Sequence, residues 1–94
     1  MIIEIFSIDS KLLSGNIISV TFPGSDGSFQ VFKDHAPIVS TLKKGEIIIE
    51  GETSLEEMAA ENIYNLKKDK ETTSLQIESG LMEMKKNSIK VLIY

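Results

Sequence analysis

The chain has 94 residues, a formal net charge of −4 and a pI near 4.9, and all ten of its basic residues are lysines. This balance argues against a nucleic-acid partner, because phosphates require clustered Lys and Arg. The chain has no cysteine, which excludes disulfides, thiolate nucleophiles and Cys-ligated zinc and fits a reducing compartment. Length and composition indicate one globular domain over residues 1–94.

The N-terminal residues are the first place to look for a targeting segment. They lack the basic region of a signal peptide, and Glu4 interrupts their short apolar run. No segment approaches the ~18–20 apolar residues of a membrane-spanning helix. We therefore expect no direct insertion into a membrane.

Most of the chain is predicted to form short β-strands. In residues 17–22 the apolar side chains Ile18, Val20 and Phe22 alternate with Ser19 and Thr21, which predicts that the apolar three share one face. Short apolar runs separated by turn signals every 8–12 residues are typical of an all-β sandwich or barrel. We predict a mainly β sandwich of about ten short strands, with segments at residues 2–8, 17–22, 27–32, 38–42, 47–49, 75–78, 80–84 and 89–93.

Residues 54–68 carry a different periodicity. A helical stripe, apolar at all but one position, comprises Leu55, Met58, Ala59, Asn62, Ile63 and Leu66. Ser54 and Glu57 have the spacing of a capping box, and Lys67 and Lys68 suit the helix C-terminus. The pattern predicts one inserted amphipathic helix, packed either on its own sheet or on a partner.

Residues 20–40 combine turn signals, strand signals and the only histidine. Pro23-Gly24 and Asp26-Gly27 are turn dipeptides, and Pro37 holds Ala36 extended. The Gly24-x-x-Gly27 spacing is not a phosphate loop, because no Gly-Lys-Ser/Thr follows it. Asp34 and His35 are adjacent in an extended segment, so their side chains should point apart and Asp34 should not orient His35 for catalysis.

The acidic residues of the central part could in principle form a cation site. A solvated face is the better interpretation, because no calcium-loop pattern is present and one histidine without cysteine leaves only carboxylates as metal ligands. We expect no catalytic residue, metal or cofactor, and a structural or interaction protein. The residues concerned are Glu46, Glu50, Glu52, Glu56, Glu57 and Glu61.

Several turns, taken in order and spacing, resemble one family, the epsilon subunit of rotary F-type ATP synthases. That family has a PG-x-x-G turn, then G-H-A-P-L, an L-K-x-G turn and an S-G-G-x-x-E-V ending that leads into a final strand. The corresponding runs here are 14–15 (SG), 22–29 (FPGSDGSF), 34–39 (DHAPIV), 42–45 (LKKG), 78–84 (ESGLMEM) and 87–92.

The chain departs from that family's pattern in four places. Asp34 stands where glycine commonly precedes the histidine, and Ser28 stands where many members carry an acidic residue. Residues 52–72 replace what is usually a short hairpin. The chain stops at Tyr94, where the family's sandwich should end, so the resemblance implies a short form without the C-terminal helical hairpin. The inhibitory switch and the ATP binding of that hairpin are therefore not expected.

The resemblance implies a non-catalytic central-stalk subunit of a proton-translocating ATP synthase. It would link the gamma subunit to the c-ring at the cytoplasmic face of a bacterial inner membrane and couple ion flow to ATP synthesis. Ser7 and Ser40 lie where the family contacts gamma. The alternatives are a free-standing β-sandwich interaction module and a small hydrolase that uses His35. The c-ring-facing residues implied are Gly24, Ser25, Asp26, Gly27, Ser28, His35, Ala36 and Pro37.

Overall fold

β-Strands and one short helix make up the fold in the computed structural model, which describes residues 1–57 and 60–94. The predicted β-sandwich is confirmed, with nine strands in this described part rather than about ten. The elements are β1 (Ile2–Phe6), β2 (Lys11–Gly24), β3 (Gly27–Phe32), β4 (Ile38–Leu42), β5 (Gly45–Leu55), α1 (Ala60–Ile63), β6 (Lys67–Asp69), β7 (Thr72–Ile77), β8 (Gly80–Lys85) and β9 (Ser88–Ile93).

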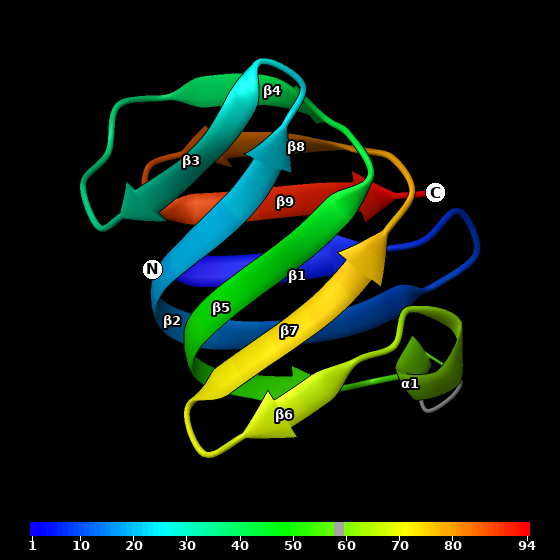
Figure 1. Cartoon of the computed structure of the whole chain (residues 1–94). Helices are drawn as coiled ribbons and strands as arrows, with labels where there is room; N and C mark the ends of the chain where they lie inside the picture. Colours follow the sequence, from blue (N-terminus) through cyan, green and yellow to red (C-terminus); the bar gives the residue numbers. More distant parts are fainter. Residues whose placement is uncertain (58–59) are drawn as a thin grey trace.

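The strands form one continuous hydrogen-bonded sheet that folds into two crossed layers (Figure 1). The first layer contains β3, the second half of β2, the first half of β5, β7 and β6. The second layer contains β4, β8, β9 and β1, and the first half of β2 adds to it beside β1. β1 and β9 run parallel, whereas the other pairs are antiparallel. The long ribbon of β2 and β5 therefore belongs to both layers.

This ribbon bends at a β-bulge. The β2–β5 register shifts between Ile17 and Ser19, opposite Gly51, which has a φ of 132°. The bulge inserts one residue, so Ile17 joins Val20 and Phe22 in the core while Ile18 is 62% exposed. The prediction that Ile18 shares a face with Val20 was wrong, because strict alternation fails across a bulge.

The predicted helix over residues 54–68 was also wrong. Ser54 and Leu55 end β5, where Leu55 pairs with Leu13, and Lys67 and Lys68 belong to β6. Among the described residues of this segment, Ala60–Ile63 alone is helical, and Ile63 is 69% exposed. Met58 and Ala59 lie outside the described residues. An isolated helix of this length is marginal in water, whereas β2 and β7 offer strand edges that satisfy the backbone.

The core lies between the two layers. Leu55, Tyr64 and Leu66 pack against its margin, so part of the predicted apolar stripe is used without a helix. The rings of Phe22 and Phe29 meet at a centroid distance of 5.5 Å. The buried apolar side chains are Ile3, Ile5, Leu12, Leu13, Ile17, Val20, Phe22, Val31, Leu42, Ile47, Ile49, Leu75, Ile77, Met82, Met84, Ile89, Val91 and Ile93.

Candidate interaction surfaces

The β2–β3 turn holds five of the residues implied by resemblance to face the c-ring. Gly24 ends β2 and is buried, Ser25 and Asp26 form the exposed turn, and Gly27 and Ser28 begin β3. β4 supports this turn: the Ser25 amide donates to the Thr41 carbonyl at 3.0 Å, and the Thr41 hydroxyl donates to Ser25 Oγ at 2.8 Å. Thr41 therefore holds both the backbone and the side chain of Ser25, while Ser25–Ser28 stay exposed to solvent.

The β3–β4 loop holds the other three implied residues. His35, Ala36 and Pro37 are all exposed, and His35 Nδ1 lies 2.7 Å from the Ala36 carbonyl oxygen. The Asp34 carboxylate does not orient His35; its Oδ1 accepts a hydrogen bond from Asn87 Nδ2 at 2.8 Å. Asp34 lies in a turn with a φ of 66°, so the expectation of an extended segment at Asp34 and His35 was wrong.

The two loops lie at opposite ends of β3 (Figure 1). β3 has six residues, so their separation along the strand is ~20 Å. The structure therefore does not bring residues 24–28 and 35–37 together at one point. A single flat partner that contacts both would have to span the length of this edge strand.

The resemblance implies that Ser7 and Ser40 face gamma. Ser7 lies just after β1 and Ser40 lies within β4, and both strands belong to the second layer. Ser7 follows β1 in a tight turn, where its amide donates to the Ser10 carbonyl at 2.8 Å. Ser40 is half-buried on the inner side of β4, because it alternates with Leu42 and pairs with Met82. Its neighbours Val39 and Thr41 point outward instead, and Val39 is 65% exposed.

The outer face of the second layer carries an apolar row that sequence reasoning missed. Phe6, Leu92 and Leu81 are paired in register across β1, β9 and β8, so their side chains share this face. Leu81 is 39% exposed and Leu92 37%, and all three line a depression of about 300 Å³. The continuous apolar run Val91-Leu92-Ile93 was the available signal, because its middle residue must point away from the core.

The outer face of the first layer is different in character. A cross-strand row there consists of Gln30, Thr21, Ile48 and Ser74, and a parallel row includes Glu46 beside Gln76. Ile48 is the apolar member of these rows and is half-buried. Phe32, which pairs with Ser19, is 53% exposed on the same face, in a different row from Ile48. The two outer faces therefore differ in arrangement: the apolar side chains of the first layer are separated by polar ones, whereas those of the second layer form a row in register.

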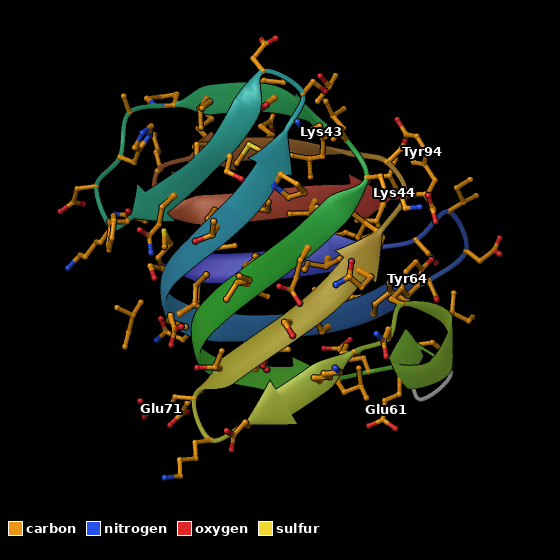
Figure 2. All side chains as sticks on the ribbon, in the orientation of Figure 1. Lys43, Lys44, Glu61, Tyr64, Glu71 and Tyr94 are labelled. Carbon is orange, nitrogen blue, oxygen red and sulfur yellow. The ribbon has the colours of Figure 1, made fainter. Side chains whose placement is uncertain are left out.

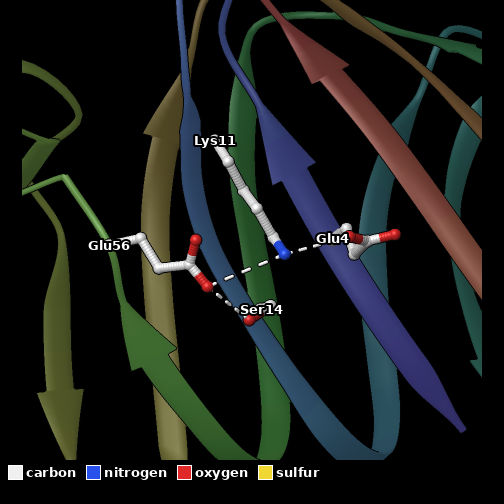
Figure 3. A network of polar contacts seen from close by, with 4 residues as sticks. All are labelled: Glu4, Lys11, Ser14 and Glu56. Carbon is white, nitrogen blue, oxygen red and sulfur yellow. Dashed lines mark hydrogen bonds and ion pairs between the residues drawn. The ribbon is translucent and has the colours of Figure 1, made fainter.

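A polar network borders the apolar row (Figure 3). Lys11, which pairs with Phe6, places its Nζ 3.0 Å from Glu4 Oε2 and 3.7 Å from Glu56 Oε1. The Ser14 hydroxyl donates to Glu56 Oε1 at 2.9 Å. The pKa of Lys11 is raised, chiefly by the hydrogen bond to Glu4; burial lowers it, and the charges of Glu56 and Glu4 add to the increase. The network forms a charged rim beside apolar surface, an arrangement common in protein interfaces.

A second depression lies at the end of the sandwich near the β1–β2 turn, with a volume of about 420 Å³. Tyr64 and Tyr94 line it from α1's side and from the chain end, and Figure 2 shows both at this end. Among residues 1–57 and 60–94, no three His, Asp or Glu side chains converge closely enough to hold a metal ion. The helix in this part of the chain is too short to cross a membrane.

Comparison with known families identifies the domain type. Residues 1–63 match the family model of the ATP synthase delta/epsilon chain β-sandwich domain. An ATP synthase epsilon chain from Chlorobium limicola is 34% identical over 85 residues, covering 90% of this chain and 78% of the relative. Another, from Leptospira interrogans, is 30% identical over 96% of this chain but 58% of its own length. The chain thus spans a little over half the length of the Leptospira relative.

One solved structure has the same fold at low sequence identity. A chain in the cryo-EM structure of the central stalk and c-ring of the Tetrahymena thermophila mitochondrial ATP synthase aligns with a TM-score of 0.63 and 10% identity. The alignment covers 99% of this chain and 62% of that one. At this identity the likeness establishes the sandwich architecture.

Proposed function

Because the chain belongs to the family of ATP synthase delta/epsilon chains through its β-sandwich domain, we propose that it is a non-catalytic subunit of the central stalk. In this role it joins the gamma subunit to the ring of c subunits and turns with them. Ion flow, expected to be protons, would thereby be coupled to ATP synthesis elsewhere in the complex. The site of action is the cytoplasmic face of a bacterial inner membrane.

The observation that carries this proposal is the inequality of the two outer faces. Phe6, Leu81 and Leu92 form an apolar row in register on the second layer, whereas Phe32 and Ile48 on the first layer lie in separate rows among polar side chains. Exposed apolar surface bordered by charges is typical of protein interaction sites. Val39 points outward on the same layer and Ser7 follows β1, so we assign this face to gamma. Ser40 belongs to the same strand as Val39 but lies on its inner side.

The remaining implied contacts fall on the edge strand β3 and its two loops. We assign residues 24–28 and 35–37 to the c-ring, with His35 as an exposed contact residue. A stiff body with separate surfaces for two partners suits the transmission of torque, because hydrogen-bonded ladders and a close-packed core resist deformation.

The test is co-expression with the cognate gamma subunit, followed by size-exclusion chromatography and a binding titration. Leu81→Thr/Leu92→Thr is expected to weaken gamma binding about tenfold or more, because interface cores lose most when apolar anchors are removed. Ile48→Thr is the matched control on the opposite face and should bind like the wild type.

Two results would count against the proposal. Independent elution of the wild-type chain and gamma would favour a free-standing interaction module with another partner. Equal loss of binding in the Ile48→Thr control would mean that the apolar row is not the gamma-binding face. Melting temperatures of all variants separate lost binding from lost folding.

A further inference from the structure

Asp34 and Asn87 lie 53 positions apart in sequence and make a reciprocal pair of hydrogen bonds. The Asp34 amide donates to Asn87 Oδ1 at 2.6 Å, and Asn87 Nδ2 donates to Asp34 Oδ1 at 2.8 Å. We propose that this pair is a clasp that positions the exposed residues 35–37 for docking, a role that rests on the function proposed above.

The backbone at both residues favours this arrangement. Asp34 has a φ of 66° and Asn87 a φ of 60°, both in the left-handed region that Asp and Asn tolerate better than most residues. Glycine at position 34 would supply the same backbone conformation without the side-chain acceptor. The aspartate therefore adds a second hydrogen bond to a position already bent for the turn.

The β8–β9 turn that contains Asn87 is itself fixed by its backbone conformation and by a hydrogen bond to β1. Lys86 and Asn87 both have positive φ, the requirement of a type I′ hairpin turn between β8 and β9. The Asn87 carbonyl also accepts a hydrogen bond from the Ile2 amide at 2.9 Å, which ties this turn to β1. The loop is thus fastened to the second layer rather than to β3 alone.

The loop needs such a fastening because its side chains provide no burial. Residues 32–37 are exposed, from Phe32 to Pro37. The other hydrogen bonds between described residues here are local, such as the His35 amide to the Phe32 carbonyl at 3.2 Å. Without the clasp, a partner would have to order this loop on binding, which lowers affinity.

The experiment uses the full chain with Asn87→Gly and Asp34→Asn. Glycine keeps the positive φ at position 87 but removes both clasp bonds, whereas asparagine at position 34 retains an oxygen acceptor and is the conservative control. Asn87→Gly should speed amide hydrogen exchange at Asp34 about tenfold or more, because two hydrogen bonds are lost. Asp34→Asn should exchange within about threefold of the wild type.

The second readout is docking on a c-ring reconstituted with gamma. We expect Asn87→Gly to bind about three- to tenfold more weakly and Asp34→Asn to bind like the wild type. Unchanged exchange in Asn87→Gly would overturn the clasp itself. Faster exchange with unchanged docking would overturn its positioning role. Failure of the wild type to dock at all would overturn that role together with the proposed function, while the exchange measurement would still judge the clasp.

Discussion

At the scale of single residues, Thr53 and Thr73 show how the interior accommodates polar atoms. Thr53 lies on β5 and Thr73 on β7, and they are 7% and 1% exposed. Their hydroxyl oxygens are 2.8 Å apart, so one hydroxyl donates a hydrogen bond to the other. Among the described residues, buried side-chain polar atoms all have partners.

This hydrogen bond predicts that the effects of substituting the two threonines on the free energy of unfolding are not additive. Thr53→Val alone should lower the free energy of unfolding by about 1–3 kcal/mol, because the Thr73 hydroxyl loses its partner in the core. Thr53→Val/Thr73→Val should be more stable than that single variant, since no unpaired hydroxyl remains. Calorimetry of the two singles and the double measures the coupling, and simple additivity would contradict it.

At the scale of elements, the bent ribbon of β2 and β5 decides the architecture. Both strands are long enough to enter both layers, and the bend occurs where the bulge of β2 faces Gly51. A Cβ at Gly51 would lie 2.6 Å from Ile17 Cα, in addition to the strain of a φ of 132°. The close approach of the two backbones therefore requires glycine here.

Gly27 offers a matched comparison for this requirement. Its φ is 125°, but a Cβ there would meet nothing within 4 Å. Gly27→Ala should therefore cost only the backbone strain, about 1–2 kcal/mol, whereas Gly51→Ala should cost about 3 kcal/mol or more, because a clash adds to the strain. Urea unfolding of both variants tests this, and equal losses would mean that the contact with Ile17 relaxes freely.

At the scale of the whole molecule, the two ends of the chain are joined in one layer. β9 lies between β1 and β8, parallel to the first and antiparallel to the second. It also contributes Ile89, Val91 and Ile93 to the core. The last strand therefore completes a layer begun by the first.

Truncation after Asn87 is expected to abolish cooperative folding. It removes three core side chains and leaves β1 and β8 with unpaired edges facing each other. Removal of Tyr94 alone, which is 55% exposed, should leave a cooperative thermal transition with a melting temperature within about 5 °C of the wild type. A cooperative transition in the shorter variant would show that β9 is dispensable for the fold.

Local patterns were sufficient for most of the strands and for one of the turns. The predicted segments 27–32 and 38–42 coincide with β3 and β4, and the predicted turn dipeptide Asp26-Gly27 lies at the β2–β3 turn. Period-2 alternation and turn residues act over a few neighbouring positions, so a single sequence carries them. The predicted face of Ile18 was wrong because a β-bulge interrupts the alternation of β2. The predicted helix over residues 54–68 was wrong because strand pairing in β5 and β6 takes up its ends.

The sequence by itself determined the β-sandwich fold class and most of its strand segments. It did not place the segments at residues 24–28 and 35–37 relative to one another. Only the tertiary structure decided that these segments lie at opposite ends of β3, that Phe6, Leu81 and Leu92 form one row, and that Asp34 meets Asn87. The reason is that strand order and register join residues far apart in the chain, whereas periodicity describes only neighbours.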